Sequence, residues 1–124
     1  MITLLYAGIL VLTAVFLANL VLYVRLRPRE QPEWRGNATM RVQANFVENV
    51  PIALILLWLL ENAGIDPRAI HAFGIALVTC RVLHAWGLAA YEAANYPRLI
   101  GAQGTFLLLS IMGVTAIYAY VLAA

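Results

Sequence analysis

The sequence predicts an all-α membrane protein built as an up-and-down bundle of four transmembrane helices, and two observations lead to this fold class. Apolar residues make up 64% of the chain and charged residues only 11%, so a soluble domain of this size could not hide its apolar surface. A bilayer core about 30 Å thick needs roughly 20 helical residues per crossing, so the 124 residues fit four crossings joined by short loops. We therefore expect a single domain over residues 1–124.

The first crossing is expected at residues 2–24, a stretch without a charged side chain. It lacks a basic segment before it and a small-x-small cleavage site after it, so we interpret it as a retained span rather than a signal peptide. It ends at RLRPRE, where Pro28 and four charges cannot remain in hydrocarbon. A polar loop is expected from there to about Asn37, and the second crossing at residues 38–62.

A tight helical hairpin is expected at ENAGIDP, between the second and third crossings. Gly64 suits a helix C-cap, Asp66 suits an N-cap, and Pro67 suits the first position of the next helix. The third crossing is expected at residues 67–94, and a turn at NYP leads to the fourth at residues 97–122. Consecutive helices are then antiparallel.

The arginines are divided unequally between the two ends of this expected bundle. The loop between the second and third spans carries only Arg68, and by the positive-inside rule both termini face away from the cytoplasm. The net charge of +2 is small and concentrated in one loop, which disfavours a nucleic-acid partner. The arginines of the first and third loops, on the expected cytoplasmic side, are Arg25, Arg27, Arg29, Arg35 and Arg98.

Polar side chains inside the second span are the first candidates for a functional site. Arg41, Asn45 and Glu48 are spaced i, i+4 and i+7, so they form one stripe at increasing depth. At about 1.5 Å per residue, Glu48 lies about 15 Å below the start of its helix and Arg81 about 21 Å along the antiparallel third helix. We therefore expect these two residues at similar depth, where an ion pair is available.

A second stripe is formed by Arg81, His84, Leu88 and Tyr91, at i, i+3, i+7 and i+10. A charge at the centre of a membrane helix costs about 2.5 to 3.5 kcal/mol, so a cluster of this size favours a pathway or a ligand site. In the structural alternative, the expected ion pair only fixes helix register while Arg41 extends to the headgroups. Both interpretations stay open for each residue alone.

Two arginines occupy helix starts, where the macrodipole is positive. Arg41 and Arg98 each lie in the first turn of an expected helix, and an anion should compensate them. A carboxylated ligand or anionic lipid headgroups would satisfy this requirement. The single cysteine, Cys80, is an incomplete metal site and is interpreted as a small apolar filler rather than a nucleophile.

These residues resemble the sequence motifs of a known family. The pattern R-x-Q-x-N-F-x-E-x-x-P over 41–51 is similar to that of the membrane-associated proteins in eicosanoid and glutathione metabolism, the MAPEG family. The resemblance continues through R-V-L-H-A-W-G over 81–87, then Arg98 and Gly101. It is greatest to the short bacterial branch, and a basic set made only of arginine suits a bacterial, GC-rich genome, so the expected location is the bacterial inner membrane.

The resemblance implies a homotrimer of four-helix subunits, with glutathione held between adjacent subunits at the cytoplasmic side. Arg98 matches the arginine that stabilises the glutathione thiolate, and it is the expected catalytic residue. Tyr91 is a looser candidate for contact with sulfur or substrate, and His84 is a candidate whose role stays open. The positions that match glutathione-binding residues are Arg41, Gln43, Asn45, Glu48 and Arg81, with Arg25 or Arg27 as a further carboxylate-binding arginine.

The expected function is that of an integral-membrane glutathione transferase, with or without peroxidase activity, and without a metal. A thiol of pKa about 8.5 is mostly protonated at neutral pH, and lowering that pKa by two units requires about 2.7 kcal/mol of preferential thiolate stabilisation. Arg98 would supply it electrostatically, and the sulfur anion would attack a hydrophobic electrophile arriving through the lipid.

Three positions depart from the family pattern and leave alternatives open. Asn49 stands where eicosanoid-forming members carry tyrosine, and His84 and Leu88 stand where leukotriene-forming members carry tyrosines, so a different electrophile is expected. A non-catalytic glutathione- or lipid-binding scaffold of the same fold is the alternative function, and another small thiol in place of glutathione is also open. A drug/proton antiporter is disfavoured because residues 2–24 hold no carboxylate.

Overall fold

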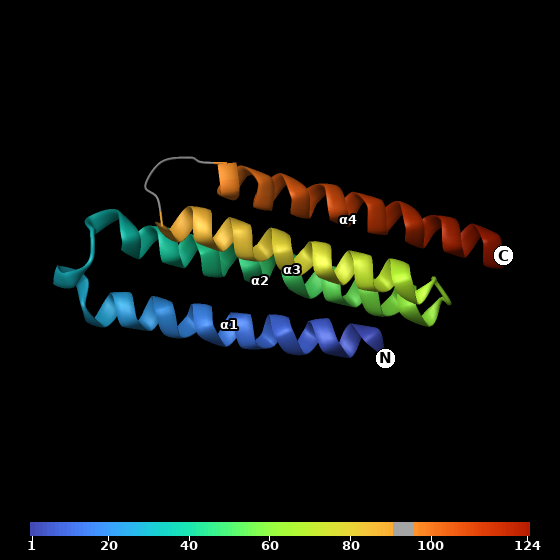
Figure 1. Ribbon diagram of the computed structural model, residues 1–124, viewed down its shortest axis with the longest axis horizontal. Coiled ribbons are helices and arrows are strands. Elements are labelled where there is room, and N and C mark those ends of the chain that lie inside the picture. The colour runs from blue at the N-terminus through green and yellow to red at the C-terminus, as the bar shows by residue number, and fades with distance from the viewer. Residues whose placement is uncertain (91–95) are drawn as a thin grey trace.

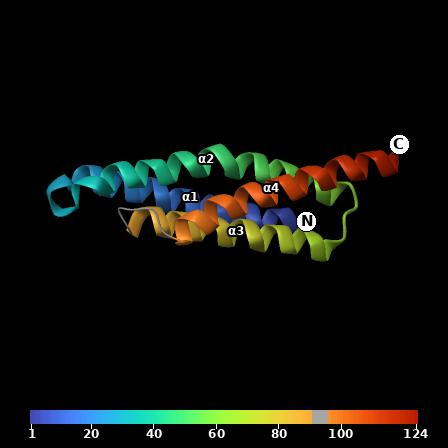
Figure 2. The same cartoon turned by 90° about the horizontal axis from the view of Figure 1, so that it is seen from above.

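The computed structural model describes residues 1–90 and 96–124, with side chains described over 1–87 and 97–124. Within these residues four long helices run side by side along the long axis of the molecule (Figure 1, Figure 2). Consecutive helices are antiparallel, so both termini lie at the same end of the bundle (Figure 1). All four helices are long and apolar enough to cross a membrane, which confirms the predicted all-α, four-span fold.

The first helix, α1, spans Ile2–Leu26 and is capped by an acid from a different helix. The Glu61 carboxylate accepts hydrogen bonds from the backbone N–H groups of Ile2 and Thr3, the latter at 2.7 Å, and from the Thr3 hydroxyl. Because the start of a helix is the positive end of its dipole, this carboxylate ties α1 to the far end of the next helix. A short 3-10 turn over Pro28–Glu30 follows α1.

The second helix, α2, spans Glu33–Asn62 and begins earlier than the sequence predicts. The expected polar loop up to Asn37 is therefore helical over its last five residues, 33–37. Gly36 and Asn37 are weak helix formers, yet both lie inside the helix. Pro32, in an extended conformation with ψ 143°, directly precedes the helix, and Glu33 places a negative charge in its first turn.

The turn between α2 and α3 agrees with the sequence-based prediction. Gly64 has φ 85°, in the left-handed region that favours glycine, and its N–H donates to the Glu61 carbonyl at 3.2 Å. The Asp66 carboxylate accepts from the Arg68 N–H at 2.8 Å, so Asp66 caps the third helix, α3, which spans Pro67–Ala90.

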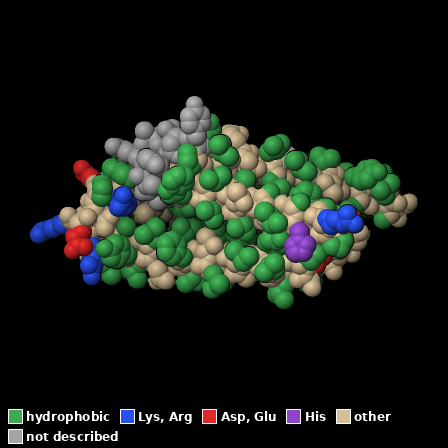
Figure 3. Space-filling model, in the orientation of Figure 1, with side chains coloured by type: hydrophobic (Ala, Val, Ile, Leu, Met, Phe, Trp, Pro, Cys, Tyr) green, Lys and Arg blue, Asp and Glu red, His purple; other side chains and the backbone are tan. Residues whose placement is uncertain are grey.

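The fourth helix, α4, spans Tyr96–Ala123 and packs along α3. Hydrophobic side chains cover the visible long side of the bundle and charged groups gather near its ends, as a membrane-spanning bundle requires (Figure 3). The buried apolar core runs the length of the bundle and includes Leu10, Leu17, Val42, Phe46, Val50, Leu57, Leu77 and Met112.

Candidate functional site

A buried polar cluster is centred on Arg81 and draws on three helices. Arg81, on α3, is only 2% exposed. Its Nη2 donates to the side-chain oxygen of Asn45 on α2, and its Nη1 donates to the hydroxyl of Thr105 on α4 at 3.3 Å. The Arg81 Nε has no hydrogen-bond partner within the described part of the chain. The guanidinium is therefore held by neutral acceptors, and its positive charge is not cancelled locally by a carboxylate of the described residues.

His84 lies one turn beyond Arg81 and is also buried. Its Nδ1 is 3.3 Å from the Arg81 Nη2. Because a guanidinium can only donate, this contact is a hydrogen bond in which the His84 Nδ1 accepts. The imidazole then carries its proton on Nε2 and is neutral, so His84 serves as a third acceptor for the Arg81 guanidinium. The sequence left the role of His84 open.

Glycine brings α3 and α4 together at this cluster. A Cβ on Gly101 would come within 2.6 Å of the Cys80 carbonyl oxygen and closer still to the His84 backbone nitrogen. Only a residue without a side chain allows this approach. Thr105 is fully buried one turn further on, where its hydroxyl donates to the Gly101 carbonyl at 2.7 Å and accepts from Arg81.

Thr105 is a site residue that the sequence-based reasoning did not identify. Its only signal in the sequence is its place four residues after Gly101 on the same helix face. Cys80 packs in the same contact, since a Cβ on Gly104 would come within 2.7 Å of the Cys80 Sγ. This packing fits the interpretation of Cys80 as a small filler. No metal-ligating group of three residues was found among the described residues.

The expected ion pair between Glu48 and Arg81 does not form between these two described residues. Glu48 is exposed, and Arg81 is buried against other partners. At about 100° of rotation per residue, Glu48 points roughly 160° away from the buried Phe46, whereas Asn45 lies at the edge of the buried face. Similar depth therefore did not place Glu48 opposite Arg81, because the direction of each side chain around its helix also matters.

Three arginines from three helices lie in or next to the polar cluster. Arg81 contacts the His84 ring, Arg41 lies one turn before Asn45, and Arg98 lies one turn before Gly101, which packs against the His84 backbone. Arg98 is half-buried in the first turn of α4, as predicted. Arg41 is exposed on the same side of α2 as Glu48 but, because α2 starts at Glu33, it lies more than two turns inside the helix, so its predicted place at a helix start was wrong. The arrangement gives this part of the bundle a concentrated positive potential, which suits an anionic ligand.

The other predicted residues take more peripheral places. Gln43 is half-buried on α2. Arg25 is exposed at the end of α1 and its Nη2 is 3.5 Å from the Met40 sulfur, while Arg27 is exposed and pairs with Glu30 at 3.5 Å. The expected ligand residue Tyr91 lies outside the described residues.

The fold and the polar cluster define a four-helix integral membrane protein with a basic site inside the bundle. The chain belongs to the MAPEG family, whose sequence pattern matches residues 3–118. It is similar to the inner membrane protein YecN of Escherichia coli strain K12 and of Escherichia coli O6:H1, with 34% identity over 50 residues in each case. That alignment takes in 40% of this chain and 38% of each relative. No solved structure matches the chain significantly.

Proposed function

We propose that the protein is an integral-membrane glutathione transferase that works as a homotrimer, with glutathione bound between adjacent subunits. Membership of the MAPEG family supports a role in glutathione metabolism. Glutathione presents carboxylates and an acidic thiol, so it is an anion of the kind that an arginine cluster favours. The second substrate is a hydrophobic electrophile that reaches the site from the lipid.

The observation that carries this proposal is the buried Arg81 guanidinium at the centre of the polar cluster, where Asn45 and Thr105 hold it. An uncompensated charge at the centre of a membrane helix costs about 2.5 to 3.5 kcal/mol. The Arg81 guanidinium meets only neutral acceptors among the described residues, so its charge is available to a carboxylate or thiolate nearby. An anion bound beside Asn45 would recover part of that cost.

In this proposal Arg98 acts on the sulfur electrostatically. An arginine cannot serve as a base at neutral pH, but a guanidinium at a helix start stabilises an adjacent anion. The thiol proton leaves to water, and the thiolate forms the new carbon–sulfur bond with the electrophile. Lowering the thiol pKa by two units requires about 2.7 kcal/mol, which is within reach of a charge-assisted contact at a helix start.

The exposed polar groups of α2 support a site shared between subunits. Arg41 and Glu48 lie on the outward side of a helix that crosses the membrane, where hydrocarbon would leave them unsatisfied. A neighbouring subunit would cover them, and Glu48 would then meet the ammonium group of glutathione. Arg25 or Arg27 of that neighbour would bind a carboxylate.

The test is a titration of detergent-purified protein with glutathione, following ligand binding and thiolate absorbance separately. Arg98→Ala should abolish the thiolate absorbance and leave most of the binding. Arg29→Ala is the matched control, because Arg29 is an exposed arginine at the same end of the bundle and is outside the proposed site. A protein that binds glutathione without forming thiolate, or that binds no glutathione, would contradict the enzyme proposal.

A non-catalytic glutathione- or lipid-binding scaffold is the second candidate function. It is favoured by Asn49, which has no hydroxyl to offer a substrate and whose side-chain amide already donates to the Asn45 carbonyl of its own helix at 2.8 Å. Mass spectrometry of products separates the two functions. An enzyme accumulates the glutathione conjugate of a supplied electrophile, whereas a scaffold binds the ligand and leaves both compounds unchanged.

A further inference from the structure

A groove between α1, α2 and α3 lies apart from the proposed glutathione site. Its upper part, defined as the part nearest the turn between α1 and α2, has a volume of about 300 Å³. This part is lined by residues of all three helices and of the turn before α2, among them Tyr23, Arg35 and Thr39. Its lower part, also about 300 Å³, is lined by Leu17, Val82 and other residues of α1 and α3. Both parts share Leu20 and Trp86, so they lie next to each other, and together they are called the groove.

The lower part of the groove has an apolar lining that suits a hydrocarbon chain. Its lining is apolar except for Thr13, and the Thr13 hydroxyl is already bonded to the Ile9 carbonyl at 2.9 Å. The groove extends from Thr13 to Val24 on α1, which at about 1.5 Å per residue is about 16 Å. That length is about half of a hydrocarbon core roughly 30 Å thick, the depth of one lipid leaflet.

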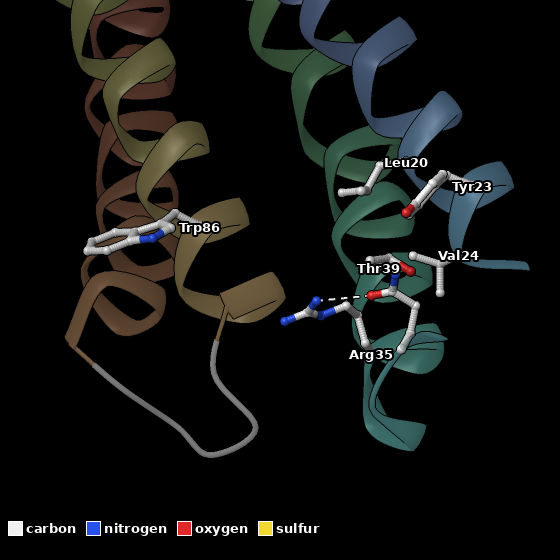
Figure 4. Close-up of a pocket in the computed structure, with 7 residues that line it drawn as sticks. Leu20, Tyr23, Val24, Arg35, Thr39 and Trp86 are labelled. Atoms are coloured by element: carbon white, nitrogen blue, oxygen red, sulfur yellow. Dashed lines mark hydrogen bonds between the residues drawn. The ribbon is translucent and has the colours of Figure 1, made fainter. Parts of the chain in front are cut away.

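The upper part of the groove carries a positive charge with unused hydrogen-bonding capacity. Arg35 reaches from α2 toward the α3 side of the groove (Figure 4). Its Nη1 donates to Gln31 at 3.0 Å and its guanidinium stacks 5.4 Å from the centre of the Trp34 ring, so the side chain is held in place. Its Nε is buried and has no hydrogen-bond partner among the described residues. A buried charged N–H of this kind favours an anionic acceptor.

We propose that this groove binds one acyl chain of an anionic phospholipid, with the lipid phosphate at Arg35. The apolar lower part of the groove holds the acyl chain, and Arg35 at the mouth of the groove binds the headgroup phosphate. These two regions are separated along the membrane normal, as the acyl chain and the headgroup are within a lipid. None of the residues assigned to the glutathione site lines the groove, so the two proposals stand or fall separately.

The test is photo-crosslinking in lipid nanodiscs. The probes are phosphatidylglycerol and phosphatidylcholine that carry the same photoreactive acyl chain, and peptide mass spectrometry locates the adducts. We expect adducts at Leu17 and Leu20, which are buried or half-buried and poorly accessible to surrounding lipid. Phosphatidylglycerol should label them about fivefold more than phosphatidylcholine, the factor that one arginine contributes near an anionic lipid.

Two variants and a control make this result specific. Arg35→Gln should remove the preference for phosphatidylglycerol. Arg29→Gln, which changes an exposed arginine in the 3-10 turn before α2, should keep it. Ala85→Phe, which fills the lower slot, should reduce labelling by both lipids. Equal labelling by the two lipids, or an unchanged preference in Arg35→Gln, would overturn the proposal. Absence of adducts at Leu17 and Leu20 would overturn it too, because it would mean that protein, such as a second copy of the chain, fills the groove.

Discussion

Replacing Gly101 with alanine tests whether the close approach of α3 and α4 holds the basic cluster together. The new Cβ would lie 2.6 Å from the Cys80 carbonyl oxygen and 2.7 Å from the His84 Cα, and both are backbone atoms that cannot rotate away. Because nonbonded contacts are most favourable at about 3.5 to 4 Å, α4 must move away by about 1 Å. That shift would stretch the 3.3 Å bond between Arg81 and Thr105 beyond hydrogen-bonding distance.

The size of the effect follows from two opposing terms. Overpacking a tight contact costs about 1 to 3 kcal/mol. Alanine regains up to about 1 kcal/mol of helix propensity over glycine. With the full offset, we expect Gly101→Ala to lower the free energy of unfolding by up to about 2 kcal/mol, measured by reversible unfolding in mixed detergent with circular dichroism. Glutathione affinity should fall with it, because the Arg81 contacts loosen.

Gly113→Ala is the matched control for this prediction. It makes the same substitution on the same helix, but a Cβ there would meet nothing within 4 Å. It should therefore leave stability unchanged or raise it by up to about 1 kcal/mol. The packing argument is refuted if Gly101→Ala is as stable as Gly113→Ala.

Two further substitutions test other contacts of the bundle. Asn45→Leu removes an acceptor from the buried Arg81 and should lower the free energy of unfolding by about 1 to 3 kcal/mol in the same assay. The control, Asn49→Leu, loses only a bond to its own helix and should cost clearly less. Equal losses would contradict a stabilising role for the Asn45–Arg81 bond. Glu61→Ala removes the carboxylate that caps α1 and should lower the melting temperature. The control, Glu33→Ala, changes an exposed acid on α2, the helix that also carries Glu61, and should lower the melting temperature less. The reverse order would contradict the capping role of Glu61.

The fold could be predicted where local chemistry decides it. Gly64, Asp66 and Pro67 specify the α2–α3 turn through backbone conformation and capping that involve only neighbouring residues, and the structure has them in those roles. The start of α2 could not be predicted in this way. Gly36 and Asn37 disfavour helix, but the helix already starts before them, at Glu33, after Pro32.

The site was less predictable because it depends on distances between helices. The stripe pattern identified Asn45, Arg81 and His84, which the structure brings together. It could not identify Thr105, because the Thr105 hydroxyl reaches Arg81 only if Gly101 allows α4 to approach α3 closely. The stripe pattern gives depth along a helix, whereas contact also requires the right direction around it, and Glu48 fails that second condition.

The outward direction of Glu48 has a functional consequence under the proposed mechanism. Had Glu48 paired with Arg81, the pair would be neutral and the empty protein more stable, but a ligand carboxylate would find no available charge there. With Arg81 held by neutral acceptors and Glu48 turned outward, the chain keeps a positive centre and a negative centre apart on neighbouring helix faces. Glutathione is itself zwitterionic, with carboxylates and an ammonium group at separate positions. A site that keeps its own charges apart can bind both kinds of group at once, and it gives up some stability of the empty protein to do so.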